Sequence, residues 1–146
     1  MIRVQREDFD PAAELSRLSA GGAGAVCSFA GLVRDSNDGH QVAAMTLEHY
    51  PGMTERVLQR LEDEARARWP IIDTLIVHRY GRLEPGDRIV LVAVASPHRD
   101  AAFDACRFLI DRLKTNAPFW KSEETPDGPR WVEARAEDDG AAAGWG

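Results

Sequence analysis

Cysteine is scarce in this chain, which has only Cys27 and Cys106 among its 146 residues. Both lie in apolar stretches, and neither has the paired local spacing that zinc sites and redox-active CxxC motifs require. Free cysteine is among the most frequently buried residue types, so we expect two buried thiols without a nucleophilic role. Two reduced thiols also favour a cytoplasmic location.

Long apolar runs and an excess of positive charge are absent too. The longest apolar run, Ile89 to Ala95, is far too short to cross a bilayer, and the first ten residues are rich in charge. The sequence therefore predicts neither membrane insertion nor export. The formal net charge is -6, and no stripe of Lys and Arg follows the chain, which argues against a nucleic-acid-binding protein. Any anion-binding site must be local.

The sequence also lacks the motifs of several large enzyme classes. It has no convincing Ser-His-Asp order, no HExxH motif and no phosphate-binding P-loop. The glycines near Gly21 do not match a dinucleotide-binding fingerprint. The residues alone therefore do not name a reaction.

The composition is that of an ordinary globular protein, with 44% hydrophobic and 29% charged residues. A chain of this length is sufficient for one compact domain with a real core. We expect one domain over residues 1–136. The last ten residues, 137–146, are acidic and then small, and we expect them to form a flexible tail.

Hydrophobic periodicity and turn residues predict an α+β, or mixed α/β, domain in which strands alternate with three helices and a hairpin closes the chain. The clearest helix has an apolar stripe that includes Phe103, Cys106 and Leu113. The expected helices are Pro11 to about Leu18, Met53 to Trp69 and His98 to Asn116. The expected strands are Ile2 to Gln5, Ala25 toward Val33, Val42 to His49, Thr74 to Tyr80, Arg88 to Ala95, Trp120 to Thr125 and Arg130 to Ala134.

Two lysines are the strongest candidates for chemistry. Lys114 falls almost in line with Phe103 and Ile110, so a cation follows the edge of the apolar stripe into the last helical turn. Lys121 follows Pro118, Phe119 and Trp120. Burial next to another cation lowers the pKa of a lysine and makes it a usable acid or base. The alternatives are a lysine that favours a helix C-terminus and a strand lysine that faces water.

Three further basic residues could hold an anion. Arg34 opens a polar loop after an apolar strand, where its planar guanidinium could bind a carboxylate or phosphate with two hydrogen bonds. His98 and Arg99 begin a helix, where free backbone N–H groups already favour an anion. Taken singly, Arg34 is better explained as an ordinary solvated loop residue, and the His98-Arg99 pair alone does not indicate a site.

Five ordered motifs, between about residues 24 and 135, resemble the large, catalytic subunit of molybdopterin synthase. The most specific one contains two lysines seven residues apart around Pro118-Phe119-Trp120. The motifs are Phe29-Ala30-Gly31-Leu32-Val33-Arg34, Leu47-Glu48-His49-Tyr50-Pro51-Gly52-Met53, His78-Arg79-Tyr80-Gly81, Ser96-Pro97-His98-Arg99 and Leu113-Lys114-Thr115-Asn116-Ala117-Pro118-Phe119-Trp120-Lys121.

The resemblance implies an α/β hammerhead fold with an added small antiparallel subdomain. It implies a homodimer flanked by two copies of a small ubiquitin-like sulfur-carrier subunit, together a heterotetramer. The carrier ends in a Gly-Gly thiocarboxylate. The implied substrate is cyclic pyranopterin monophosphate, which receives two sulfurs to form the dithiolene of molybdopterin in molybdenum cofactor biosynthesis. The resemblance implies no metal and no cofactor for this sulfur transfer.

The resemblance also assigns roles to individual residues. Lys114 and Lys121 match the two lysines of the catalytic pocket, and which of them is acid and which is base stays open. Arg135 matches an arginine that reaches across the dimer. The implied substrate-binding residues are Phe29, Leu32, Val33, Arg34, His98, Arg99, Lys114, Lys121, Ser122, Glu123 and Arg135. The alternative function is a non-catalytic anion-binding or carrier-docking module of the same fold.

Overall fold

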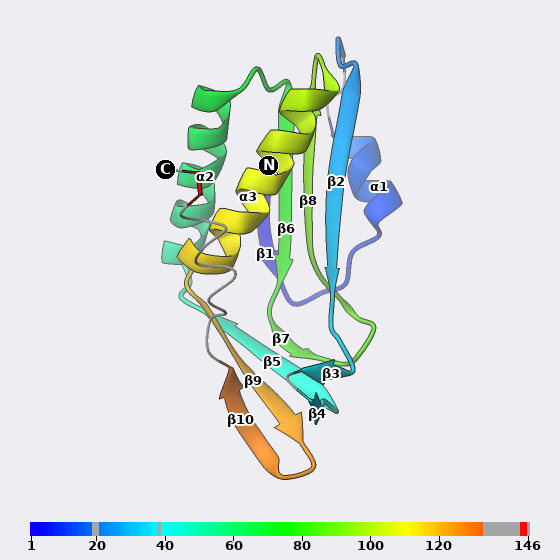
Figure 1. Cartoon of the computed structure of the whole chain (residues 1–146), viewed down its shortest axis with the longest axis vertical. Coiled ribbons are helices and arrows are strands. Elements are labelled where there is room, and N and C mark those ends of the chain that lie inside the picture. Colours follow the sequence, from blue (N-terminus) through cyan, green and yellow to red (C-terminus); the bar gives the residue numbers. More distant parts are fainter. Residues whose placement is uncertain (19–20, 38, 133–143, 146) are drawn as a thin grey trace.

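The computed structural model describes residues 1–18, 21–37, 39–132 and 144–145, which form two main β-sheets and three helices (Figure 1). The helices are α1 (Pro11–Arg17), α2 (Met53–Arg68) and α3 (Arg99–Asn116). In spatial order, the larger sheet contains β1 (Ile2–Gln5), β6 (Asp73–Arg79), β8 (Arg88–Ser96) and β2 (Ala25–Leu32). The smaller sheet contains β10 (Gly128–Val132), β9 (Phe119–Thr125), β5 (Ala44–His49) and β7 (Gly81–Leu83). The short strands β3 (Ser36–Asn37) and β4 (His40–Gln41) pair with each other.

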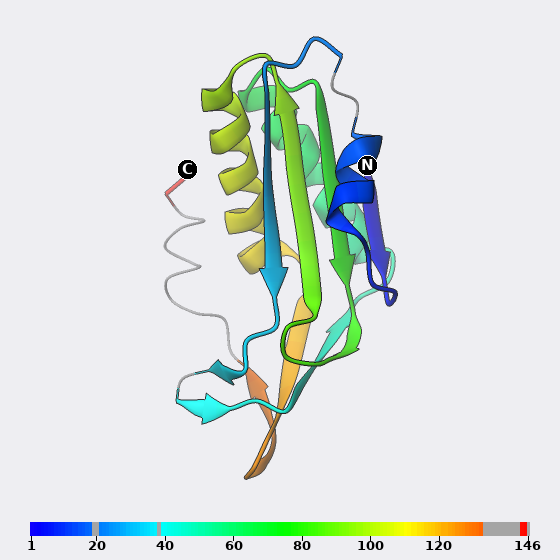
Figure 2. The same ribbon diagram turned by 90° about the vertical axis from the view of Figure 1, so that its right-hand side faces the viewer.

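The larger sheet is covered on both faces, with α3 on one side and α1 on the other (Figure 2). Because neighbouring side chains of a strand point to opposite faces, the apolar strand β8 supplies both cores. Val90, Val92 and Val94 belong to the cluster that includes α2 and α3. The alternate residues of the strand, such as Leu91 and Ala93, belong to the cluster that contains Leu15 and Leu18 around α1. Burial on both faces explains why β8 is a continuous apolar run.

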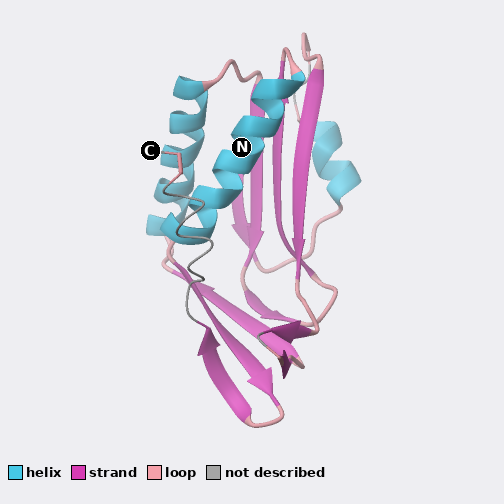
Figure 3. Ribbon diagram, in the orientation of Figure 1, coloured by secondary structure: helices cyan, strands magenta, loops and turns pink. Residues whose placement is uncertain are grey.

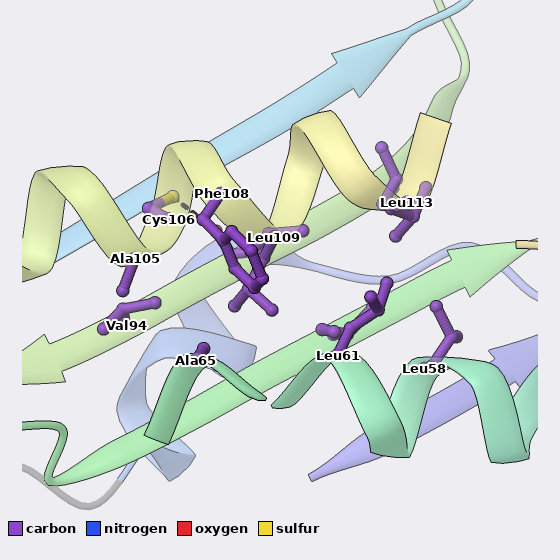
Figure 4. Packing of buried hydrophobic residues seen from close by; sticks show 12 residues of the cluster. Leu58, Leu61, Ala65, Val94, Ala105, Cys106, Phe108, Leu109 and Leu113 are labelled. Atoms are coloured by element: carbon purple, nitrogen blue, oxygen red, sulfur yellow. Dashed lines mark hydrogen bonds between the residues drawn. The ribbon is translucent and has the colours of Figure 1, made fainter. Parts of the chain in front are cut away.

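The packing of α3 differs in one respect from the expected stripe. Phe108 is fully buried against α2, whereas Phe103 is 60% exposed. Figure 4 shows Phe108 and Leu109 of α3 facing Leu61 of α2 in this core. The side of α3 that carries Phe103 therefore points away from the core. Helical periodicity locates an apolar stripe, but it does not say which edge of that stripe touches the sheet.

The smaller sheet lies at one end of the larger sheet, where α3 leads directly into β9 (Figure 3). β9 pairs antiparallel with β5, so that Phe119 lies opposite His49 and Lys121 opposite Leu47. β9 and β10 form the expected terminal hairpin, with Gly128 at φ 106° in the turn. The fold thus places the segment around Lys121 at the junction of the two sheets.

The expected α+β class and its added antiparallel sheet are confirmed. The strand predicted from Ile2 to Gln5 is confirmed as β1, which lies at the edge of the larger sheet and pairs parallel with β6. β6 and β8, which were also predicted as strands, are antiparallel neighbours, and the segment between them adds β7 to the smaller sheet. The strand predicted from Val42 begins at Ala44.

Most of the predicted flexible tail, like residues 133–134 of the last predicted strand, lies outside the described residues. Within the described part, the Trp145 ring packs edge-on against Trp69 and Phe108, with centroid distances of 5.5 and 5.6 Å. The Trp145 indole N–H also donates to the Asp111 carboxylate at 2.8 Å. At Trp145, therefore, the chain contacts α2 and α3.

Candidate active site

Two lysines flank the junction of the sheets, and they are the only lysines in the sequence. Of the 18 basic residues, 16 are arginine, and the remaining two are Lys114 and Lys121. Lys114 is exposed in the last turn of α3, and Lys121 is half-buried in β9. Only residues 117 and 118 separate the helix from the strand. The fold therefore holds both ammonium-bearing segments at one junction.

Lys114 continues a row of side chains that lines a pocket. Phe103, Arg107 and Ile110 recur at spacings of four and three residues along α3, and Lys114 is the next member of that row. The pocket encloses about 370 Å³ between β2 and α3. It is lined by Cys27, Ser28, Phe29, Phe103, Asp104, Cys106, Arg107 and Ile110. Phe29, an expected substrate-binding residue, thus lines this pocket together with Ile110 of the helical stripe.

Lys121 lies on the face of β9 that also carries Phe119 and Glu123. Its cross-strand neighbours are Leu47 in β5 and Val132 in β10. Glu123 is buried and accepts a hydrogen bond from the Arg130 guanidinium at 3.1 Å. This ion pair balances the charge of the buried carboxylate. Ser122 points to the opposite face of β9 by strand alternation.

The loop after β2 is anchored through its backbone. The Val33 N–H donates to the Asp87 carbonyl oxygen at 2.9 Å, and the Gly86 N–H donates to the Val33 carbonyl oxygen at 2.9 Å. The Val33 side chain is buried, whereas Leu32 and Arg34 are exposed. Val33 therefore fixes the loop, and its two neighbours are the residues presented at the surface.

His98 and Arg99 lie at the opposite end of α3 from Lys114. His98 is the N-cap residue, and both side chains are exposed. Lys114 comes fifteen residues after Arg99, and a rise of 1.5 Å per residue separates their backbones by about 22 Å. One copy of the chain therefore does not bring the predicted anion-binding pair beside Lys114. Arg135 lies outside the described residues.

Four aromatic rings, which we call the ring ladder, connect the two sheets beside the lysines. The ladder comprises Tyr80, His49, Phe119 and His78. Successive ring centroids are 4.5, 5.9 and 3.8 Å apart, and the His78 and Phe119 rings are stacked with an interplanar angle of 17°. His78 and His49 had no predicted role. The available signal was their position in two of the motifs that carry the resemblance.

The His78 ring is neutral at physiological pH. Burial lowers the pKa of His78 from its ordinary 6.5 to about 4, against the opposing effect of a hydrogen bond with the Arg79 carbonyl. The positive charge of Lys114 and the nearby His49 lower this pKa further. The ring is therefore subject to the electrostatic effect of the Lys114 ammonium but carries no charge itself.

The two cysteines differ in burial, so the expectation of two buried thiols is confirmed for Cys106 only. Cys106 is buried, Cys27 is half-buried, and both are free. Burial, together with the neighbouring Cys27 thiol, raises the pKa of Cys106 to about 12. The Cys106 thiolate is therefore scarce at neutral pH.

Among the described residues, no group of three or more His, Cys, Asp and Glu side chains is arranged to hold a metal ion. No helix within the described ranges is both long and apolar enough to span a membrane.

Comparisons with known proteins point to one family. The model of the family described as "MoaE protein" matches residues 4–116. The molybdopterin synthase catalytic subunit of Pseudomonas aeruginosa is 58% identical over 146 residues, covering 99% of this chain and 97% of that protein.

Solved structures agree with this result. The molybdopterin biosynthesis MoaE protein from Burkholderia ambifaria is 54% identical with a TM-score of 0.85, covering 99% of this chain and 97% of that one. A complex of subunits 1 and 2 of the molybdopterin-converting factor from Helicobacter pylori is 19% identical with a TM-score of 0.76, covering 92% and 91%. At that identity, the likeness concerns the fold.

The depressed pKa of His78 predicts an acid-sensitive fold. Above pH 6.5 the ring is neutral in both states, but between pH 6.5 and about pH 4 only the unfolded chain binds the proton. The free energy of unfolding should therefore fall as the pH drops through this window, by on the order of 3 kcal/mol, and this contribution should level off below it. Urea unfolding followed by circular dichroism measures the effect. His78→Gln, which does not titrate, should show a shallower slope, and an identical slope in both proteins contradicts the assignment.

Proposed function

This chain belongs to the MoaE protein family, and from that membership we propose that it is the catalytic subunit of a molybdopterin synthase. In this reaction two sulfurs pass from the C-terminal thiocarboxylate of a small carrier protein to cyclic pyranopterin monophosphate. The product is the dithiolene of molybdopterin, an intermediate of molybdenum cofactor biosynthesis. The chain is thus an enzyme subunit, a sulfurtransferase.

The observation that carries this proposal is the placement of the two lysines at one junction. Both reactants are anionic, because the pterin bears a phosphate and the carrier presents a thiocarboxylate. Two ammonium groups at the end of α3 and in β9 attract both reactants and stabilise the charge that develops during sulfur attack. An ammonium can also give up a proton, which a guanidinium cannot do in a protein. Lys114 and Lys121 are therefore assigned to orient the thiocarboxylate and to move protons as water is lost.

The pocket between β2 and α3 supports a place for the carrier's terminus. Its lining is largely apolar, with Phe29, Phe103 and Ile110 as walls, and the row along α3 leads from it to Lys114. A Gly-Gly terminus has no side chains, so its backbone could lie along this surface without steric conflict. The related fold from Helicobacter pylori was solved as a complex of two subunits, which supports a small ubiquitin-like partner for this chain.

The sulfur arrives already activated on the carrier, so the chain needs no nucleophilic cysteine. This agrees with the raised pKa of Cys106. Neither a metal nor a cofactor enters the proposed step. The free thiols of Cys27 and Cys106 also support a cytoplasmic location.

A second copy of the chain is part of the proposal. His98 and Arg99 lie about 22 Å along α3 from Lys114, so a pocket that uses all three must take residues from two copies. Arg135 is proposed to reach across in the same way. Phe29, Leu32, Arg34, Ser122 and Glu123 complete the proposed substrate-binding set, with Val33 as the anchor of its loop. Two carriers on such a homodimer make a heterotetramer.

The alternative is a non-catalytic anion-binding or carrier-docking module of the same fold. Such a module would bind the pterin or the carrier without changing either. Product formation separates the two functions, because a docking module forms no dithiolene.

We expect Lys114→Ala and Lys121→Ala each to lower the rate of dithiolene formation by about 100-fold or more, since each removes a proton-transferring cation. The assay mixes purified chain, thiocarboxylated carrier and cyclic pyranopterin monophosphate and measures the dithiolene product. Arg60→Ala, which removes an exposed cation from α2, is the matched control and should keep the full rate. Undiminished product from both lysine variants would remove their catalytic assignment.

We expect the active protein to be dimeric. Arg99→Ala and Lys121→Ala should each be inactive alone, but mixing them should restore part of the activity, because one pocket of the mixed dimer keeps both residues. Analytical ultracentrifugation establishes the dimer, and the assay follows the recovery. A monomeric active species, or no recovery in a mixture shown to contain mixed dimers, would rule out the shared pocket.

A further inference from the structure

The ring ladder has no part in the reaction as proposed, although all four of its members belong to the motifs that carry the family resemblance. It runs between the two sheets, from Tyr80 and His49 to Phe119 and His78. His78 is in β6 of the larger sheet, and it is only 5% exposed. Phe119 opens β9 of the smaller sheet. The stacked pair therefore fixes one sheet against the other at the point where α3 ends.

Hydrogen bonds hold the two histidine rings in place. The Nδ1 atom of His78 lies 2.8 Å from the Arg79 carbonyl oxygen, and because a carbonyl only accepts, this nitrogen carries the proton. The Nδ1 atom of His49 lies 3.0 Å from the hydroxyl oxygen of Thr54, which donates its own proton to the Tyr50 carbonyl at 2.9 Å. His49 is therefore the donor to Thr54. With both rings oriented in this way, the ladder is a rigid element.

Phe119 joins this rigid element to the lysines. It comes five residues after Lys114 and two residues before Lys121. Its N–H donates to the Ala117 carbonyl oxygen at 2.8 Å, which closes the turn between α3 and β9. Whatever holds the Phe119 ring therefore also holds the end of the helix and the start of the strand.

We propose that His78 is a positioning residue of the two-lysine site: its neutral ring, stacked on Phe119, holds the turn between α3 and β9 and sets where Lys114 and Lys121 lie relative to each other. This inference rests on the proposed function of the lysines. It gives a role to a buried histidine that the proposed reaction does not use.

The choice of residue at position 78 follows from the charge of Lys114, which acts on the ring. A carboxylate here would attract the ammonium and compete with the anionic reactants for it. A permanent cation would repel the ammonium and weaken the stack. A neutral ring avoids both effects, and its one N–H is satisfied by the Arg79 carbonyl. The His78 ring therefore positions the lysines without forming an ion pair with either of them.

The kinetic test compares four variants in the dithiolene assay. We expect His78→Leu and Phe119→Leu each to lower kcat about tenfold with KM within about twofold of the original, because a small misplacement of catalytic groups costs rate. His78→Phe keeps a flat ring against Phe119 and should restore most of kcat. Val77→Ala is the matched control, because Val77 is the buried neighbour of His78 on the opposite face of β6. It should lose stability but keep kcat per folded molecule.

A second readout does not depend on activity. Reductive methylation with ¹³C-formaldehyde labels Lys114, Lys121 and the N-terminal amine, since the chain has no other amines. The methyl NMR signals of both lysines should move in His78→Leu and in Phe119→Leu, and stay in place in Val77→Ala. The half-buried Phe119 probes the same contact from its other side, so the result does not depend on how well the His78 variant folds.

The outcomes separate this inference from the proposed function. Unchanged kcat and unchanged lysine signals in Phe119→Leu would overturn the positioning role, as would an equal loss of kcat in Val77→Ala. The double variant of His78→Leu and Phe119→Leu should be no worse than the poorer single variant, and fully additive losses would also contradict a shared contact. If the unaltered protein forms no dithiolene while the lysine signals respond as expected, the proposed function fails and the positioning role stands.

Discussion

The contact between the His78 and Phe119 rings is the interaction on which the arrangement of the candidate site depends. It joins the larger sheet to the smaller one where α3 gives way to β9. Without this contact, the orientation of α3 relative to β9 would depend on the two residues that connect them. β6 pairs with the buried strand β8, in which Val90 lies opposite His78. This pairing fixes the position of His78 within the larger sheet.

Arginine and lysine occupy different positions in this chain. Several arginines pair with carboxylates, including Arg82 with Glu124 at 3.1 Å and Arg130 with Glu123 at 3.1 Å. Lysine appears only at positions 114 and 121. A lysine ammonium can exchange a proton near neutrality when its surroundings shift its pKa, whereas a guanidinium stays charged, and we therefore propose that the chemistry belongs to these two residues. In a protein of net charge -6, the proposed anion site is local and lies against a repulsive background.

Much of this fold could be predicted from the sequence, because its elements have strong local signals. β8 is a continuous apolar run, α3 has a clear helical stripe, and the terminal hairpin has a turn rich in Pro and Gly. β3, β4 and β7 have two or three residues each, too few to show a period. The exposure of Phe103 could not be predicted, since a stripe does not reveal which edge meets the sheet.

The site was only partly predictable for a related reason. The lysines were predicted as site residues because of their positions along a helical stripe and in an apolar segment, and that assignment stays a prediction. The length of α3 implies that Arg99 and Lys114 lie far apart, which is why the proposed pocket uses a second copy. The ring ladder could not be predicted without the fold, because His49, His78 and Phe119 come from three separate strands.

The central claim is that Lys114 and Lys121 act together on one anionic guest. Titrating the ¹³C-methylated protein with a peptide that ends in a Gly-Gly carboxylate, as a substitute for the thiocarboxylate, tests this most directly. The account predicts that the methyl signals of both lysines move with one shared dissociation constant, and that the same peptide with an amidated end moves neither. A response of one lysine alone, or equal responses to both peptides, would contradict it.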